Sequence, residues 1–369
     1  MKRRTFLAAS GAFAAAATLP ISALAQAGAS AMTAEWIGPY GGVPAFDKVR
    51  TEGFVPALTA AMKADTAEIN AIANNCAKPT FDNTIAALER SGDMLDRVDT
   101  LYGVWSGTLS TPEMRAIEKE MSPKLSAHSD ETLQNAKLFA RIEAVYEDRA
   151  KLTPEQQRLT WVYWNRFVRA GGELSPADKA RVAQINQELA GLFTNFSQNL
   201  LADETDYVLY LRTESELAGL PDDVRAAAAT AAEERGHKGE YAFLNTRSSM
   251  DPFLTYSKRR DLREKVWRTY YSRGDNGDAK DNNANIRKIL KLRYERAQLL
   301  GFPTHAHWRL DNAMAKTPDA AMELMMRVWP SAIARVKDEV AEMQAIADQE
   351  KSGVKIEPWD YRFYAEKVR

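Results

Sequence analysis

The sequence predicts a mainly α-helical protein, and three observations support this fold class. Apolar residues recur every three or four positions in long segments, which is the period of a helix face. Four pairs of serine or threonine with proline mark helix starts, and runs with strand character are short and few. The chain has 369 residues, 45% of them hydrophobic and 27% charged, which suits one large helical body or two globular domains.

Residues 1–25 are predicted to be an export signal and not part of the fold. Positive residues at 2–4 precede an apolar, alanine-rich stretch at 6–19 that is too short to span a membrane. Ala25 ends a small-x-small cleavage pattern, so Gln26 is the expected mature N-terminus. The string at 3–7 resembles the twin-arginine consensus, and an ordinary Sec signal is the alternative. Both predict a periplasmic protein with no stable membrane anchor after signal removal.

The mature chain is expected to begin with an extended arm over 26–50, because glycine and proline dominate its segment 38–42. An N-terminal helical region is predicted over 51–205, and a second helical region with a small β element over 206–369. Ser91 and Gly92 are expected to kink one helix of the first region. The residues expected to line helix faces are, in chain order, Phe54, Leu58, Met62, Ile69 and Ile72; Phe81, Ile85, Leu88, Leu95, Val98 and Trp105; Val182, Ile185, Leu189, Leu192, Phe196 and Leu200; Ile286, Ile289, Arg293, Ala297 and Leu300; and Ile333, Val336, Val340 and Met343.

Helix starts are predicted where a hydroxyl side chain precedes proline, at Thr111, Thr153, Ser175 and Thr317. The hydroxyl accepts a hydrogen bond from a free backbone N–H, and proline at the first helical position loses no needed donor. Gln156 stands three residues after Thr153, which completes a capping box.

The β element is predicted near residues 206–245. Two β-prone runs, at 207–211 and 241–244, flank an alanine-rich helix over 223–235. These two runs are expected to pair as a small hairpin-like sheet.

Charge and cysteine content exclude several classes of function. Lysine and arginine number 49 and aspartate and glutamate 50, so the net charge of -1 offers no basic footprint for nucleic acid. The single cysteine, Cys76, excludes an intrachain disulfide and a cysteine-rich metal site. Cys76 is interpreted as a small, partly buried side chain rather than a nucleophile.

The four histidines, His128, His237, His305 and His307, do not form a recognisable metal motif. None begins an HExxH string, which places two imidazoles on one helix face. On a helix, residues two apart point about 200° apart, so the rings of His305 and His307 could not share an ion there. They are interpreted as residues at a helix start, with a metal role as the second possibility.

No other catalytic motif is visible in the sequence. It contains no phosphate-binding glycine loop, no dinucleotide fingerprint after a strand and no GxSxG elbow. Carboxylate pairs such as Glu233 with Glu234 are expected by chance among 50 acidic residues. The aromatic run Trp161, Tyr163, Trp164 and Phe167 has helical spacing, which favours core packing over a ligand platform. The residues alone therefore assign no catalytic residue, no metal ligand and no substrate-binding residue.

Three groups of strings nevertheless resemble one enzyme family. They are PTFDNTI at 79–85 with LERSG at 88–92, LLGFP at 299–303 with AMAKTP at 313–318, and PWDYRFYAEKVR at 358–369. In identity and order they resemble the N-terminal half of the thimet oligopeptidase family of zinc metallopeptidases, in its branch of peptidyl-dipeptidases and oligopeptidase A. The resemblance runs from about residue 34 to residue 369.

The resemblance implies an elongated, multi-helix lobe beside a channel for short peptides. It also implies zinc-dependent hydrolysis that releases dipeptides from free C-termini, with a zinc-bound water as nucleophile and a glutamate as base. Family members carry HExxH downstream of the Pro-Trp-Asp string, and this sequence does not contain it. The 369-residue chain is therefore expected to be an inactive N-terminal portion of a longer enzyme and to expose apolar surface.

A second hypothesis belongs to a different class. The chain is then a non-catalytic periplasmic helical module that binds or scaffolds peptides. DNA downstream of codon 369 distinguishes the two, because a coding continuation with HExxH favours the enzyme.

Overall fold

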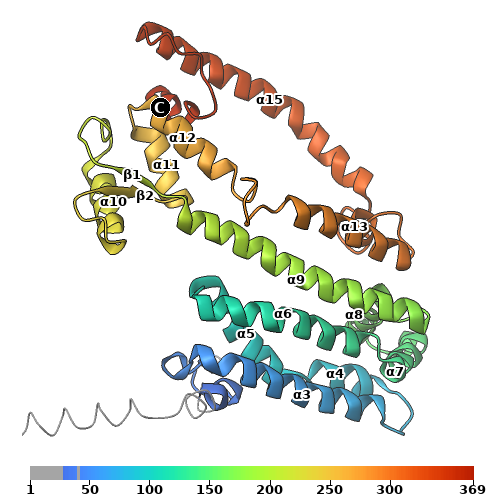
Figure 1. Ribbon diagram of the computed structural model, residues 1–369. Coiled ribbons are helices and arrows are strands. Elements are labelled where there is room, and N and C mark those ends of the chain that lie inside the picture. Colours follow the sequence, from blue (N-terminus) through green and yellow to red (C-terminus); the bar gives the residue numbers. More distant parts are fainter. Residues whose placement is uncertain (1–27, 40–41) are drawn as a thin grey trace, which may run out of the picture. The chain divides into compact units, whose positions relative to one another are not determined.

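The structure is a computed structural model that describes residues 28–39 and 42–369. Its described part is mainly α-helical with one two-stranded sheet, which confirms the predicted fold class (Figure 1). Contacts between Cα atoms divide the chain into two compact units. Unit 1 comprises the described residues up to 194 together with 295–302, and unit 2 comprises 195–294 and 303–369.

Unit 1 consists of helices, most of them long enough to bury a continuous apolar face. In chain order its elements are η2 (Phe46–Lys48), η3 (Thr51–Gly53), α3 (Phe54–Ala73), the π-helical turn η4 (Phe81–Ile85), α4 (Ala86–Glu89), α5 (Asp93–Thr108), α6 (Pro112–Leu133), α7 (Ala136–Glu147), η5 (Arg149–Lys151), α8 (Pro154–Arg169), the first part of α9 (Pro176–Asp206) and the last part of α13 (Asn283–Leu299).

Two apolar clusters hold unit 1 together, and α3 contributes to both. Phe54 and Leu58, near the start of α3, are fully buried against α5 and α6. Ile72, at its other end, packs with η4, α7 and α8 around Ile142. One helix thus contributes to both cores through residues three and four apart, as the spacing predicts.

Unit 2 contains the sheet and the later helices. Its elements are the rest of α9, β1 (Leu209–Leu211), α10 (Asp222–Glu234), β2 (Tyr241–Phe243), α11 (Arg247–Tyr256), α12 (Arg260–Tyr271), the first part of α13 (Asn283–Leu299), α14 (His305–Leu310), α15 (Pro318–Gln349) and α16 (Tyr361–Val368). Helices α9 and α13 each run from one unit into the other.

The predicted β element is confirmed. Strands β1 and β2 pair antiparallel, with Leu209 opposite Phe243 and Leu211 opposite Tyr241. The alanine-rich helix α10 lies between them in sequence and packs on β2 in the same apolar cluster as Phe253.

All four predicted helix starts are confirmed. The side chains of Thr111, Thr153, Ser175 and Thr317 each accept a hydrogen bond from a backbone N–H in the first turn of α6, α8, α9 and α15. The capping box at Thr153 is complete, since the side chain of Gln156 accepts a hydrogen bond from the N–H of Thr153 in return.

Three local predictions need correction or lie outside the described residues. The N-terminal arm is not simply extended, because residues 28–33 are helical and bury Met32 in the first cluster of unit 1. The expected kink at Ser91 and Gly92 is a complete break, because Gly92 adopts a left-handed conformation with φ 87° between α4 and α5. The predicted signal, with Ala25 and Gln26, lies outside the described residues.

Within the described part of the chain, no helix combines the length and the apolar character required to cross a membrane.

Candidate functional site

The histidines were the first candidates for a metal site, and the structure keeps them in separate settings. His128 lies on α6 in unit 1, whereas His237 follows α10 in unit 2. His305 and His307 begin the short helix α14, whose cap is Thr304, as the interpretation of a helix start predicts. Among residues 28–39 and 42–369, no three histidine, cysteine, aspartate or glutamate side chains gather closely enough to hold a metal ion.

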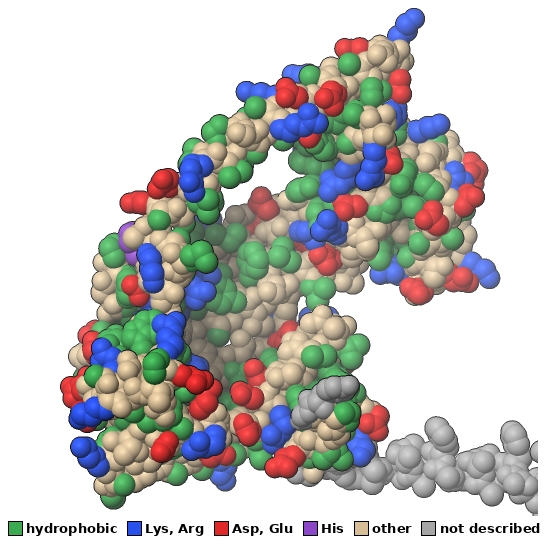
Figure 2. All heavy atoms as spheres, turned by 180° about the vertical axis from the view of Figure 1, so that it is seen from behind, with side chains coloured by type: hydrophobic (Ala, Val, Ile, Leu, Met, Phe, Trp, Pro, Cys, Tyr) green, Lys and Arg blue, Asp and Glu red, His purple; other side chains and the backbone are tan. Residues whose placement is uncertain are grey.

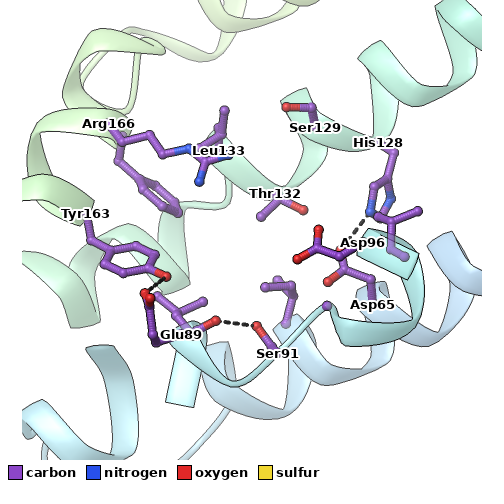
Figure 3. Close-up of a pocket in the computed structure, with 15 residues that line it drawn as sticks. Asp65, Glu89, Ser91, Asp96, His128, Ser129, Thr132, Leu133, Tyr163 and Arg166 are labelled. Carbon is purple, nitrogen blue, oxygen red and sulfur yellow. Dashed lines mark hydrogen bonds and ion pairs between the residues drawn. The ribbon is translucent and has the colours of Figure 1, made fainter. Parts of the chain in front are cut away.

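Unit 1 contains a polar pocket of about 340 Å³. Its walls come from α3, from the segment that joins α4 to α5, from α6 and from α8 (Figure 3). The side chains and backbone that line it belong to Asp65, Ile69, Leu88, Glu89, Ser91, Gly92, Leu95, Asp96, His128, Ser129, Thr132, Leu133, Tyr163, Arg166 and Phe167.

A hydrogen bond between two helices forms one side of this pocket. Nε2 of His128, on α6, lies 2.7 Å from Oδ2 of Asp65, on α3. Both side chains are only about one tenth exposed, at 11% and 12%. Burial strengthens such a hydrogen bond because little water competes for it. The pair therefore fixes the orientation of the imidazole within the pocket.

A second hydrogen bond forms the opposite side. The hydroxyl of Tyr163, on α8, donates to a carboxylate oxygen of Glu89 over 2.6 Å. Burial raises the pKa of Tyr163, and the hydrogen bond to Glu89 raises it further, so the phenol stays protonated at neutral pH. Figure 3 shows Arg166, from the next turn of α8, on the same side of the pocket as Tyr163.

The floor of the pocket depends on glycine at position 92. Its φ of 87° belongs to the left-handed region, and its N–H donates to the carboxylate of Glu68 over 2.8 Å. A Cβ atom at this position would lie 3.2 Å from Oδ1 of Asp65. A larger residue would therefore strain the turn and press on the carboxylate that holds His128.

The hydroxyl groups of the pocket are not arranged as a serine nucleophile requires. Among the described residues, no hydrogen bond joins His128 to Ser91 or Ser129, and the hydroxyl of Ser91 donates to the carbonyl of Leu88 instead. A serine nucleophile with an adjacent base is therefore not assembled here. Carboxylates from three helical segments and one guanidinium make it a polar cavity. Sequence spacing gave no signal for it, because His128 and Asp65 are 63 positions apart.

A buried aspartate lies on α6 two residues beyond His128. Asp130 is 7% exposed and accepts a hydrogen bond from Asn186 on α9. Burial raises its pKa to about 6, although the hydrogen bond from Asn186 and the charge of Arg296 oppose the shift.

The string at 358–369 forms a buried ion-pair network in unit 2. Asp360 is fully buried, and its carboxylate accepts hydrogen bonds from Arg263 over 2.7 Å and from Arg260 over 2.9 Å. Trp359 is 9% exposed and lies edge-on to Trp267 on α12, so its ring is packed against that helix. These contacts join α12 to the start of α16, so this string has a structural role.

Two further interpretations from the sequence can be compared with the structure. Cys76 is exposed and not partly buried, because it lies in the connection after α3 where no helix covers it. In the aromatic run of α8, Phe167 is buried and Trp164 stacks on Tyr146, which confirms core packing for those two. Tyr163 also packs against this core and contributes to the pocket wall.

Comparison with known proteins identifies relatives of the chain. Residues 253–369 match the sequence family described as Peptidase family M3. The dipeptidyl carboxypeptidase of Escherichia coli (strain K12) is 37% identical over 328 residues, which cover 88% of this chain and 48% of that protein. Oligopeptidase A of Salmonella typhimurium is 28% identical over 333 residues, covering 89% of this chain and 49% of that protein. The chain thus spans about half the length of the curated relatives that it matches, and the predicted resemblance to the family is confirmed.

Proposed function

We propose that this chain, which is related in sequence to peptidase family M3, is part of an exported zinc metallopeptidase that hydrolyses short peptides and releases C-terminal dipeptides. The observation that supports this most is the similarity to a dipeptidyl carboxypeptidase along 88% of the chain. The similarity to oligopeptidase A supports a peptidase in the same way without favouring dipeptide release.

The described residues of the chain do not fit a zinc site. No three ligand-type side chains gather among them, and the histidines of α6 and α14 belong to different units. In this proposal the metal and the catalytic base belong to protein that this chain does not span. The chain itself supplies helical structure beside the peptide, and its pocket at His128 and Tyr163 is not required for the reaction.

Hydrolysis measurements test this division. We expect the purified 369-residue chain, supplied with zinc, to show no chelator-sensitive cleavage of a short peptide with a free C-terminus. We expect a product extended through the downstream DNA to cleave that peptide and release dipeptides. The matched control is the extended product treated with chelator and then resupplied with zinc.

Two results would contradict the proposal. Robust chelator-sensitive turnover by the 369-residue chain would place the metal site within it. Downstream DNA that encodes no related sequence would favour a non-catalytic helical module that binds peptides.

A further inference from the structure

Helix α15 exposes an unusual amount of apolar surface. Every residue from 322 to 338 is exposed, and large apolar side chains are frequent among them. Figure 2 shows hydrophobic side chains along this helix. The most regular set, called here the α15 stripe, consists of Met322, Met325, Met326, Trp329, Ile333 and Val336, which are 37–59% exposed.

The α15 stripe has the spacing of a helix packing face. From Met322 onwards, the steps to Met325, Trp329, Ile333 and Val336 are 3, 4, 4 and 3 residues. Side chains at these steps lie above one another on one side of a helix. An exposed row of this length differs from single exposed apolar residues, which are common on protein surfaces.

The same face is buried further along the helix. The series continues through Val340, Met343 and Ala347, and the last two are 1% and 0% exposed. There α16 and the segment before it cover the face, with Tyr364 in the shared cluster. The α15 stripe is therefore the uncovered continuation of an interface that already packs α15 against α16.

A polar role does not explain the stripe. Arg335 forms an ion pair with Glu339 of the same helix over 3.1 Å. This charged pair does not include any residue of the stripe. The three methionines have flexible side chains that adapt to the shape of an apolar partner. The surface therefore fits a complementary apolar face, and its regular 3–4 spacing favours a helix as that partner.

We propose that the α15 stripe is the docking surface for a helix in the part of the M3 peptidase that this chain does not span. The inference rests on the proposed function. It is supported by the position of α15 inside the segment 253–369 that matches the family, and by relatives that are about twice as long as their aligned part. In such a relative the remaining part belongs to the same polypeptide, so its effective concentration at the stripe is high. This favours a helix of that part over a second copy of this chain as the occupant of the stripe.

Reassembly in two pieces tests the proposal. The probe is the part of the Escherichia coli dipeptidyl carboxypeptidase outside its alignment with this chain, tagged and co-expressed with the 369-residue chain. We expect the two to co-purify in equal amounts. Ile333→Asp, in the stripe, is expected to weaken the complex at least tenfold. Ser331→Asp, on the opposite side of the same helix, is the matched control and is expected to leave it unchanged.

Thiol labelling gives a second readout that does not depend on affinity. Because Cys76 is the only cysteine, Cys76→Ser provides a cysteine-free background. Ile333→Cys in that background should react rapidly in the chain alone and at least tenfold more slowly in the complex. Ser331→Cys should react rapidly in both.

Several outcomes would overturn the docking site. These are no co-purification, a complex that Ile333→Asp does not weaken, and a thiol at 333 that is protected in the chain alone. If the thiol at 333 is protected while the chain has the mass of a monomer, the chain covers its own stripe. If it is protected while the chain has twice that mass, a second copy is the occupant.

The peptidase proposal fails separately. A complex that forms through the stripe but lacks chelator-sensitive peptide hydrolysis would contradict the function and leave the docking site intact. Hydrolysis that persists in a complex insensitive to Ile333→Asp would contradict the docking site alone.

Discussion

At the scale of single residues, Asp360 places a buried carboxylate within unit 2. It is fully buried and pairs with Arg263, which is only 3% exposed. Removing one partner of a buried ion pair leaves an uncompensated charge in a poorly solvated site, which costs far more than losing an exposed pair.

Asp360→Asn is therefore expected to lower the free energy of unfolding of unit 2 by about 3 kcal/mol or more. Urea unfolding of the two proteins measures the difference. The control is Asp261→Asn, whose pair with Arg259 is exposed to solvent and is therefore expected to contribute far less. Equal effects of the two substitutions would show that burial of Asp360 does not strengthen its role.

The raised pKa of Asp130 gives a pH dependence with a definite sign. In the folded chain its pKa is about 6, above the ordinary value of 3.8, so the folded state binds the proton more tightly than the unfolded state. This group therefore lowers stability as the pH rises from about 4 to about 6, and the penalty stays constant above that range.

Asp130→Asn is expected to remove this penalty and to increase stability above pH 6 relative to the parent, while the difference disappears near pH 4. Denaturant unfolding from pH 4 to pH 7 measures this difference in stability.

Glu216→Gln is a control with the opposite sign, because hydrogen bonds from the backbone of Arg212 and Thr213 lower the pKa of Glu216. That carboxylate stabilises the fold at neutral pH and loses the contribution as the pH falls through its folded pKa. Parallel pH profiles for parent and Asp130→Asn would contradict the assignment.

At the scale of elements, helix α8 depends on the residue that caps its start, Thr153. The side chain of Thr153 accepts a hydrogen bond from the backbone N–H of Gln156, and the side chain of Gln156 accepts one from the N–H of Thr153. The helix that they start carries Tyr163 and Arg166 of the pocket in unit 1. Thr153→Val keeps the shape of the side chain but removes the acceptor. We expect a loss of about 1 kcal/mol in the free energy of unfolding.

Thermal unfolding of Thr153→Val and Thr153→Ser measures this contribution. The serine variant retains the hydroxyl and should unfold at nearly the parent temperature. If both variants lost the same stability, the methyl group and not the cap would be responsible.

Local signals in the sequence predicted the elements well, whereas long-range relations were not accessible. The caps at Thr111, Thr153, Ser175 and Thr317 are set by neighbouring residues, and all four form as predicted. The pairing of Asp65 with His128 depends on how α3 packs on α6, which no spacing along the chain encodes.

Periodicity also predicts a face without predicting what covers it. The series Ile333, Val336, Val340 and Met343 does lie on one side of α15, but only Met343 in this series is fully buried. Cys76 and the segment 28–33 show the same limit, because their exposure and burial depend on neighbours that are distant in sequence.

At the scale of the whole molecule, the export proposal makes a prediction about the mature protein. The predicted signal has a positive start, an apolar stretch and a cleavage pattern ending at Ala25. Expression in a bacterial host followed by fractionation should recover the chain in the periplasm with Gln26 as its first residue. N-terminal sequencing measures this directly.

Substitution of both Arg3 and Arg4 by lysine distinguishes the two export routes. Under the twin-arginine hypothesis the doubly substituted chain stays in the cytoplasm, whereas a Sec signal tolerates the change because the positive charge is kept. Recovery of the unsubstituted chain in the cytoplasm with its first 25 residues intact would contradict export by either route.

The ion-pair network of Asp360 has a consequence for synthesis on the ribosome. Arg260 and Arg263 are translated 100 and 97 residues before the carboxylate that neutralises them. While the polypeptide grows, α12 emerges with two guanidinium groups that have no counter-ion from this site and must remain hydrated. The contacts between α12 and Asp360 can therefore form only after residue 360 has been translated, and until then the exposed surface of α12 remains prone to aggregation.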